Sequence, residues 1–161
     1  MPNFSELFEK ANWEPIEYNG KTVILLDKFP VKNEDVLLTS IEKTNSDDRQ
    51  GLSIDITGYC ELEGEKVKTG KGVRLLFWED TAPKQIHVKV FTKTDFVWVE
   101  NIWENISHTG AKSVDYGRYG SAMIVEEIPN GRRYRCNDWH PDENFDDIVF
   151  TIQKIDSSPQ E

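Results

Sequence analysis

The chain has 161 residues, which is enough for one ordinary domain or at most two very small ones. It is 37% hydrophobic and 30% charged, a mixture that can bury a core and that excludes wholesale disorder. Its formal charge is -10, so nucleic acid and anionic membranes are poor partners, because both are bound through Lys and Arg. The sequence contains no apolar run near the ~20 residues that span a bilayer.

The first segment, residues 1–13, is predicted to form the helix of the chain. Asn3 can cap it, with Glu6 three places later completing a capping box. Four apolar residues then follow the spacing of one buried helix face: Phe4, Leu7, Phe8 and Ala11. The segment lacks the basic region, apolar stretch and cleavage site of a secretory signal peptide. This predicts a cytoplasmic protein, with release by a non-classical route as the alternative.

After the helix, the hydrophobic pattern changes to a period of two, which predicts strands. Asn19-Gly20 and Asn130-Gly131 are hairpin turn signals, and Gly58 indicates a bulge or a close backbone approach. The run at residues 73–78 is apolar apart from Arg74, which predicts a central strand covered on both faces. The predicted strands are residues 16–18, 21–26, 35–43, 52–62, 73–78, 86–90, 96–103, 122–128, 132–136 and 148–155.

These strands predict an all-β fold: a single antiparallel β-sandwich, jelly-roll-like, with a short N-terminal helix. A β-barrel is the alternative. One domain is expected over residues 1–161, ending in a polar tail at 156–161. Residues 44–50, 63–72 and 105–120 are expected to be loops, and the last of these is the longest irregular stretch.

Two cysteines, Cys60 and Cys136, are too few for a disulfide framework in a chain of this size. Each stands in a predicted strand with apolar or aromatic neighbours. Buried free thiols are therefore the favoured interpretation, and a single disulfide bond is the alternative.

The segment from Asp138 to Asp147 holds five acids and no base between two predicted strands. Its sequence is Asp-Trp-His-Pro-Asp-Glu-Asn-Phe-Asp-Asp. Such a density of like charge is unfavourable unless water or a cation screens it. Hard divalent ions, Ca²⁺ above all, take several oxygen ligands from a backbone that curls around them. The segment offers oxygen-bearing side chains at positions i, i+4, i+6, i+8 and i+9. Soft ligands are absent, so zinc and copper fit less well.

The order of these residues resembles the calcium loop of bacterial two-calcium lectins of the fucose- and mannose-binding kind. The shared pattern is an acid, three residues, Asp, any residue, Asp or Asn, an aromatic residue, Asn or Asp, Asp, and then an apolar strand. In those lectins the loop holds two adjacent calcium ions, and sugar hydroxyls complete their coordination. The resemblance implies that the Ca²⁺ ligands are Asp138, Asp142, Asn144, Asp146 and Asp147.

The resemblance covers this loop and the start of the strand after it, at residue 148. It implies that Phe145 packs under the loop. The chain departs from the lectin pattern at three points. Asn144 replaces the more usual Asp, and Asp138 replaces the longer Glu. The chain also continues to Glu161, whereas the lectins end soon after this strand, where the terminal carboxylate of a partner chain joins the calcium site.

A solvated turn is the alternative interpretation of the acidic segment. Its side-chain oxygens would then cap nearby N–H groups. Three preceding arginines could neutralise the acids as surface ion pairs: Arg132, Arg133 and Arg135.

Aromatic residues near the acidic segment are candidates for ligand contact. Trp139 stands inside the polar loop, where an aromatic side chain has little core to reach. It can therefore form a platform beside a ligand. The predicted ligand-binding residues are Trp139, His140, Tyr116 and Tyr119.

The sequence favours a non-catalytic module that binds a glycan or another hydroxyl-rich ligand through Ca²⁺. The alternative is a cytoplasmic acidic protein-interaction factor, such as an immunity protein or a phage-encoded inhibitor, that masks a basic partner protein without metal. A hydrolase is a weaker third hypothesis. Glu126 and Glu127 are adjacent in a strand and so point to opposite faces, and no nucleophile motif is present.

Overall fold

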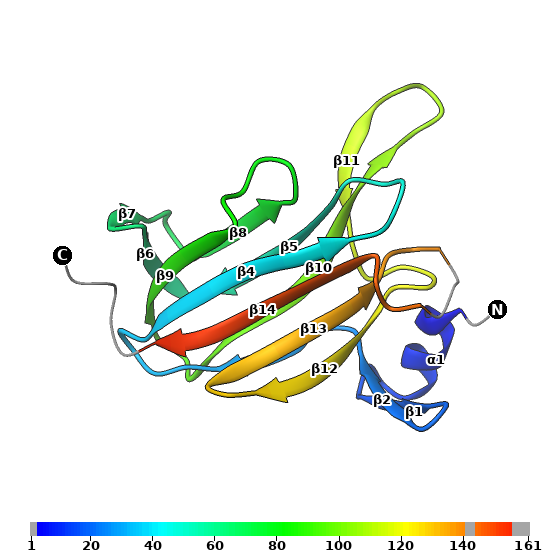
Figure 1. Ribbon diagram of the computed structural model, residues 1–161, viewed down its shortest axis with the longest axis horizontal. Helices are drawn as coiled ribbons and strands as arrows, with labels where there is room; N and C mark the ends of the chain where they lie inside the picture. The colour runs from blue at the N-terminus through cyan, green and yellow to red at the C-terminus, as the bar shows by residue number, and fades with distance from the viewer. Residues whose placement is uncertain (1–2, 141–143, 156–161) are drawn as a thin grey trace.

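In a computed structural model of the chain, two antiparallel β-sheets pack face to face (Figure 1). The structure describes residues 3–140 and 144–155. Helix α1 (Phe4–Lys10) precedes the strands. The strands are β1 (Ile16–Tyr18), β2 (Lys21–Ile24), β3 (Asp27–Pro30), β4 (Val36–Thr44), β5 (Gln50–Ile56), β6 (Gly58–Leu62), β7 (Glu65–Val67), β8 (Val73–Trp78), β9 (Gln85–Thr92), β10 (Phe96–Ile106), β11 (Lys112–Asp115), β12 (Ala122–Ile128), β13 (Gly131–Asn137) and β14 (Ile148–Ile155).

The larger sheet has nine strands in the order β1-β2-β12-β13-β14-β4-β9-β6-β7. The smaller sheet has the order β11-β10-β5-β8, and β3 pairs with the same long strand β10. The described strand pairs are antiparallel and the two sheets remain separate, so the predicted β-sandwich is confirmed and the β-barrel alternative is not observed.

The main core lies between the two sheets, and alternate residues along each strand contribute side chains to it. On β5, Leu52, Ile54 and Ile56 are buried, as their spacing predicts. A smaller core lies beside α1, where aromatic side chains of the helix meet β2 and the last loop. Its buried members are Phe4, Phe8, Val23, Ala122 and Phe145.

Helix α1 is shorter than the predicted segment of residues 1–13. The cap is as predicted, because the side chain of Asn3 accepts a hydrogen bond from the backbone N–H of Glu6. The helix ends at Lys10 because Asn12 and Trp13 adopt positive φ angles of 54° and 66°, which a right-handed helix does not contain.

Both predicted hairpins form, but one turn differs from the prediction. Asn19-Gly20 has φ angles of 51° and 80°, the backbone that a type I′ turn requires. The second turn is Pro129-Asn130 rather than Asn130-Gly131, because Gly131 already pairs across the hairpin. A Cβ on Gly131 would lie 2.0 Å from the carbonyl oxygen of Ile152. This glycine therefore permits a close strand approach instead of making the turn.

The predicted strand at residues 52–62 is two strands in different sheets. β5 ends at Ile56 in the smaller sheet, and β6 begins at Gly58 in the larger one. A Cβ on Gly58 would lie 2.0 Å from the carbonyl oxygen of Phe91, so the predicted close approach is confirmed. It occurs where the chain crosses between the sheets.

The prediction that residues 73–78 form a doubly covered central strand is wrong. β8 is the last strand of the smaller sheet, with Val73, Leu75 and Phe77 buried and Arg74 and Leu76 exposed. Leu76 is apolar although it lies on the exposed face, and this made the run resemble a covered strand in spite of Arg74.

Three short strands lie outside the predicted set: β3, β7 and β11. β7 and β11 fall in segments 63–72 and 105–120, which we expected to be loops. These strands are three or four residues long, and β7 and β11 are mostly polar, so they carry no readable alternation. Each is held by pairing with a longer neighbour, β6 or β10.

Cys60 and Cys136 are free and buried, as the favoured interpretation predicts. Burial raises the pKa of Cys60 to about 11, with a smaller contribution from Glu61. Burial likewise raises the pKa of Cys136 well above its usual value. Both thiols are therefore protonated and unreactive at neutral pH.

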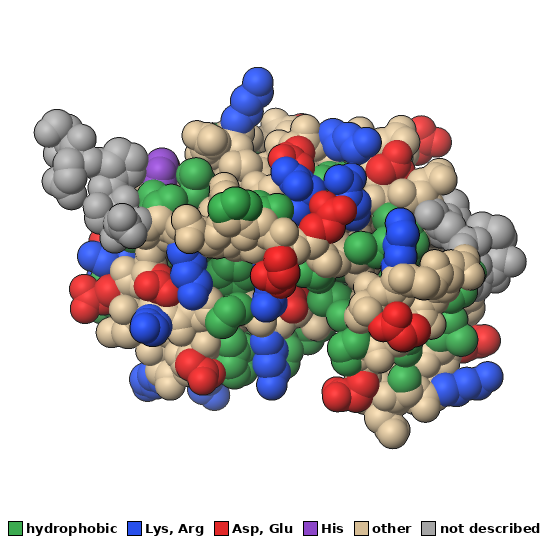
Figure 2. All heavy atoms as spheres, turned by 60° about the horizontal axis from the view of Figure 1, so that its bottom comes forward, with side chains coloured by type: hydrophobic (Ala, Val, Ile, Leu, Met, Phe, Trp, Pro, Cys, Tyr) green, Lys and Arg blue, Asp and Glu red, His purple; other side chains and the backbone are tan. Residues whose placement is uncertain are grey.

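The excess negative charge of the chain is not gathered on the face that Figure 2 shows. Lys, Arg, Asp and Glu side chains intermingle across that view, with hydrophobic side chains visible between them. Among the described residues, no helix is long and apolar enough to cross a membrane.

Candidate functional site

Three loops meet at one end of the sandwich, which we call the acidic end (Figure 1). They are the β4–β5 loop (residues 45–49), the β11–β12 loop (116–121) and the β13–β14 loop (138–147). β4 and β14 are adjacent in the larger sheet, which brings the first and third loops side by side. The backbone N–H of Gly120 donates to the carbonyl oxygen of Trp139 at 3.2 Å and ties the second loop to the third.

The carboxylate of Asp138 is fully buried at the centre of the acidic end. Its Oδ2 accepts hydrogen bonds from Ser46 Oγ (2.7 Å) and Gln50 Nε2 (3.1 Å). Its Oδ1 accepts one from the backbone N–H of His140 (3.0 Å) and lies 3.0 Å from His140 Nδ1. Burial alone would raise the pKa of Asp138, but these hydrogen bonds, that of Ser46 first, outweigh burial and lower it. The carboxylate is therefore ionised although it is buried.

Asp147 lies next to Asp138 and fixes the backbone of the acidic loop. Its Oδ2 accepts a hydrogen bond from the backbone N–H of Asp138 at 2.9 Å, and its carbonyl oxygen accepts one from Asn45 at 3.0 Å. Beneath the loop, the ring of Phe145 lies 5.9 Å from that of Phe4 in the smaller core. Phe145 thus packs where the lectin resemblance implies.

Asp48, Asp138 and His140 place one ligand atom each within 4.8 Å of one another. In the described part of the chain, this is the one group of three or more His, Cys, Asp or Glu side chains that could hold a metal ion. Nδ1 of His140 lies 3.0 Å from Asp138 Oδ1 and 3.8 Å from Asp48 Oδ2. A proton on the ring would therefore interact with both carboxylates, and the three ligand atoms are close enough together to be candidate ligands of one metal ion.

The electrostatics of this cluster favour positive charge. Burial of the His140 ring opposes protonation, but its hydrogen bond to Asp138 and the charges of Asp138, Asp48 and Asp147 outweigh burial. Together they raise the pKa of His140 above its usual value. The same carboxylates would attract any other cation that enters.

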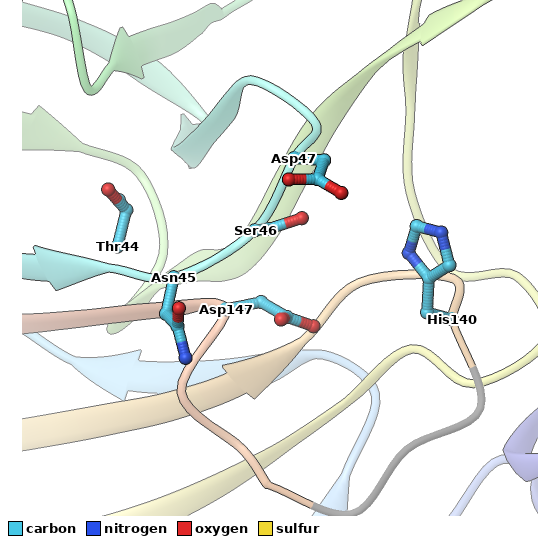
Figure 3. Close-up of a pocket in the computed structure, with 6 residues that line it drawn as sticks. All are labelled: Thr44, Asn45, Ser46, Asp47, His140 and Asp147. Atoms are coloured by element: carbon cyan, nitrogen blue, oxygen red, sulfur yellow. The ribbon is translucent and has the colours of Figure 1, made fainter.

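A polar pocket of about 460 Å³ lies beside the cluster (Figure 3). In that view Ser46, Asp47 and Asp147 point toward the side of the pocket where His140 stands. The pocket is lined by Thr44, Asn45, Ser46, Asp47, His140 and Asp147. Its hydroxyl, amide and carboxylate groups suit a ligand that is rich in hydroxyls or positively charged.

Two exposed aromatic side chains stand next to the cluster. Trp139 is 38% exposed, and its Nε1–H donates to Asp48 Oδ2 at 2.9 Å. The ring of Tyr119 lies 6.5 Å from that of Trp139 and is 53% exposed. Tyr116, also a predicted ligand contact, lies elsewhere: its ring stacks under the guanidinium of Arg74 on β8, at 4.6 Å.

The five predicted metal ligands fall into different surroundings. Asp138 belongs to the cluster, and Asp147 lines the pocket. Asp146 accepts a hydrogen bond from Asn45 Nδ2 at 3.0 Å. Asn144 is exposed, and Asp142 lies outside the described residues. A complete five-ligand site over these residues therefore stays a prediction.

Asp48 is the functional candidate that sequence reasoning overlooks. It lies 91 positions before Trp139 in the chain, inside residues 44–50, which are predicted only to form a loop. The pair Asp47-Asp48 is the one available signal, and it is weak, because acidic pairs are common in loops. The pairing of β4 with β14, which the sequence does not specify, brings Asp48 to the site.

The three arginines that could neutralise the acidic loop bind other carboxylates. Arg132 pairs with Asp27 and Glu127 on the opposite side of the hairpin from the other two. Arg133 and Arg135 pair along the outer face of the larger sheet, and their partners there are Glu42 and Glu126. Among the described residues, the ion pairs of these arginines are thus with carboxylates outside the acidic segment.

The residues of the acidic end fit a divalent cation. Gln50 Oε1 and Asp146 Oδ1 are buried and have no hydrogen-bond partner among the described residues. The amide of Gln50 is beside Asp138, since its Nε2 donates to that carboxylate. Carboxylate and amide oxygens suit hard ions such as Ca²⁺, whereas the imidazole of His140 suits Mn²⁺ or Zn²⁺ better.

No family model, curated protein or solved structure matches the chain. The likeness to two-calcium lectins therefore rests on the loop residues alone. Any functional conclusion has to come from the geometry of the acidic end.

Proposed function

We propose that the chain is a non-catalytic binding module that holds a divalent cation at its acidic end and, through it, a glycan or another hydroxyl-rich ligand. One observation carries the proposal. Asp48, Asp138 and His140 from two separate loops converge within 4.8 Å at the rim of a polar pocket of about 460 Å³. The exposed ring of Trp139 stands beside them, which supplies the apolar contact that sugar rings need.

In this proposal, carboxylates bind the cation and the polar groups of the ligand, and Trp139 supplies the apolar contact. A bound cation would draw hydroxyl oxygens of the ligand toward the carboxylates of Asp48 and Asp138. Asp47 is exposed at the pocket and can accept hydrogen bonds from further hydroxyls. Trp139 is held in place by its hydrogen bond to Asp48, so the apolar platform and the cation site are positioned by one side chain.

The identity of the ion divides the proposal into two testable versions. Ca²⁺ is the ion that the loop sequence predicts, and it requires oxygen ligands beyond those of the cluster. Mn²⁺ or Zn²⁺ is favoured by the participation of His140 in the cluster. A cytoplasmic calcium site would need the high affinity of a buffer protein, whereas a released protein would not.

Calorimetric titration of the chelator-treated protein with Ca²⁺, Mn²⁺ and Zn²⁺ tests the cation site. We expect saturable heat with one of them, and a melting temperature that rises with its concentration. Asp48→Asn should weaken that binding at least about tenfold, because one of two carboxylates loses its charge. Glu65→Gln, a change of the same kind on β7, serves as the matched control and should bind as the unaltered chain does.

A glycan array, read with and without chelator, tests the second half of the proposal. We expect binding to a hydroxyl-rich ligand that is lost on chelation and reduced by Trp139→Ala. Flat titrations with all three ions would contradict the cation site. Ligand binding that survives chelation would instead retain the pocket and exclude the cation.

A basic protein partner is the second candidate, and a specific observation favours it. Asp47 and Asp48 lie beside exposed Trp139 and Tyr119, an arrangement that can receive a Lys or Arg side chain through charge and ring contact. In that case the metal titrations stay flat. Binding of a basic peptide would weaken steeply with salt and be reduced by Asp47→Asn.

A further inference from the structure

The β4–β5 loop carries the chain from the larger sheet to the smaller one and holds part of the candidate cation site. β4 ends at Thr44 in the larger sheet, and β5 begins at Gln50 in the smaller one. Between them, residues 45–47 line the polar pocket, and Asp48 is one of the three clustered candidate metal ligands. A binding site on a loop needs support from neighbouring residues, because loops are more mobile than the strands they connect.

One carboxylate joins the two ends of this loop. Glu79, directly after β8, accepts a hydrogen bond at Oε1 from Thr44 Oγ1, at 2.7 Å. Its Oε2 accepts another from the backbone N–H of Gln50, also at 2.7 Å. The backbone N–H of Glu79 donates in turn to the carbonyl oxygen of Gln50 at 2.9 Å. The residue before the loop and the residue after it are therefore held by the same side chain.

Strand alternation explains how the side chain of Glu79 reaches both sheets. Along β8 every second residue from Val73 is buried in the core between the sheets. Glu79 continues this alternation, and its hydrogen bond to Thr44 crosses from the smaller sheet to the larger one. In Figure 3 the side chain of Thr44 accordingly points away from the other labelled residues of the pocket.

Both held ends of the loop are connected to the acidic end by further hydrogen bonds. The side chain of Gln50 is fully buried, and its Nε2 donates to the carbonyl oxygen of Asp48 and to Asp138 Oδ2, both at 3.1 Å. At the other end, the backbone N–H of Asn45 donates to the carbonyl oxygen of Asp147 at 3.0 Å. A displacement of either end of the loop would therefore disturb the cluster or the pocket.

We propose that Glu79 is a positioning residue of the cation site, because it holds the β4–β5 loop in the geometry that presents Asp48. In the described part of the chain, Glu79 belongs neither to the cluster nor to the residues that line the pocket. It acts through Thr44 and Gln50 rather than by binding the ion. The inference rests on the proposed cation site. Residues that orient metal ligands in this way commonly contribute about ten- to a hundredfold in metal affinity.

Calorimetric titration of chelator-treated variants with Ca²⁺, Mn²⁺ and Zn²⁺ tests this role. Glu79→Ala should weaken binding of the ion that the unaltered chain binds by about tenfold or more, because both ends of the loop lose their hydrogen-bond acceptor. Glu79→Gln should retain most of the affinity, since its amide can accept from the Gln50 N–H and donate to the Thr44 hydroxyl. Both variants remove the negative charge, so the difference between them separates positioning from charge.

A second substitution tests the same contact from the other side. Thr44→Val keeps the shape of the side chain and removes one of the two side-chain hydrogen bonds. It should weaken ion binding by a smaller factor than Glu79→Ala. Circular dichroism checks that each variant is folded.

Hydrogen exchange measured in chelator reports on the loop without any ion. We expect the amides of residues 44–50 to exchange faster in Glu79→Ala than in the unaltered chain or in Glu79→Gln. Asp35→Ala is the matched control, because Asp35 accepts a hydrogen bond from the backbone N–H of Lys32 at 2.7 Å in the loop before β4, at the other end of that strand. This control should leave both the exchange of residues 44–50 and the ion affinity unchanged.

The outcomes distinguish the positioning role from the cation site itself. Flat titrations of the unaltered chain with all three ions would contradict the cation site, and the positioning role with it. If the unaltered chain binds an ion and Glu79→Ala and Thr44→Val bind it equally well, the positioning role alone is overturned. Equal weakening in Glu79→Ala and Glu79→Gln would indicate an effect of charge and overturn it too. So would a loss of the same size in Asp35→Ala.

Discussion

Carboxylates are stabilised in two different ways in this molecule. On the outer face of the larger sheet, Glu42 and Glu126 alternate with Arg133 and Arg135 in an ion-pair ladder, with N–O distances of 2.8 Å, 3.7 Å and 3.0 Å. At the acidic end, Asp138 is held by a hydroxyl, an amide, a backbone N–H and an imidazole. The ladder is neutral and exposed, whereas the acidic end is negative and partly buried.

The difference between these two sets of carboxylates indicates where a cation can bind. In the ladder each carboxylate already has a guanidinium partner, and the hydrogen bonds from Arg135 lower the pKa of Glu126. At the acidic end, the hydroxyl of Ser46, the amide of Gln50 and a backbone N–H hold the carboxylate of Asp138 without carrying positive charge. In the described part of the chain, the acidic end therefore combines a buried, ionised carboxylate with nearby acidic side chains, which is what a cation-binding site requires.

The largest expected effect is that of removing the buried carboxylate. Asp138→Ala leaves the hydroxyl of Ser46 and the amide of Gln50 without their acceptor and opens a cavity. We expect a loss of about 3–5 kcal/mol in the free energy of unfolding, measured by urea denaturation in chelator. Asp47→Ala removes an exposed carboxylate from the same end and should change stability little. Equal effects of the two substitutions would contradict the role given to Asp138.

Glu100 lies between the two types, because it has an arginine partner and is still largely buried. Burial raises its pKa to about 7; Arg74 lowers it and Asp55 raises it further. At pH 4 the carboxyl of Glu100 is mainly protonated in both the folded and the unfolded chain. The full contribution of the neutral carboxyl to the stability of the fold is therefore present at this pH.

The stability that Glu100 contributes is lost as the pH rises from 4.5 through about 7, because the unfolded chain releases the proton first. The shift corresponds to about 3 kcal/mol. Glu100→Gln should remove this part of the pH dependence, so that the variant gains stability relative to the unaltered chain between pH 4 and pH 8. Urea denaturation at several pH values measures it. Parallel curves for the two proteins would show that the carboxyl titrates normally.

A smaller effect is expected from one neutral donor of the acidic end. Ser46→Ala removes the 2.7 Å hydrogen bond to the buried carboxylate of Asp138. A hydrogen bond to a charged group contributes about 1.5–3 kcal/mol, and we expect a loss near the lower value because Ser46 is half-buried. Ser113→Ala, on the exposed strand β11, is the control and should be neutral in the same denaturation experiment. Indistinguishable curves for the two serine variants would mean that water replaces the Ser46 hydroxyl.

Most of the fold can be predicted from the sequence because it depends on local patterns. The alternation of Leu52, Ile54 and Ile56 specifies a strand with a core face, and Asn19-Gly20 specifies a tight hairpin. The prediction fails where the environment of a strand depends on which other strands pair with it. β8 is an edge strand although its sequence is apolar apart from Arg74, since sheet order decides which strand is covered.

The acidic end is only partly predictable for the same reason. The density of acids from Asp138 to Asp147 identifies the loop as a candidate site. The polar sequence around Trp139 identifies this residue as a candidate ligand contact. Asp48 enters the cluster because β4 lies beside β14, and a pairing between strands so distant in sequence follows from packing of the whole sandwich. Likewise, the arginines adjacent to the loop in sequence point away from it, because residues of β13 alternate between the two faces of the sheet.

The smallest expected effect belongs to the ion-pair ladder. Glu42 and Arg133 are 40% and 30% exposed, so solvent and salt screen their attraction. A double-mutant cycle with Glu42→Gln and Arg133→Gln should give a coupling energy of about 0.2–1 kcal/mol, which decreases as salt is added. The same cycle with Ser46→Ala and Asp138→Ala should give a larger coupling that salt changes little, because that pair is shielded from solvent. The two cycles could instead give the same coupling energy and the same salt dependence. Burial would then not distinguish the two regions, which would contradict the interpretation of the acidic end as a specialised site.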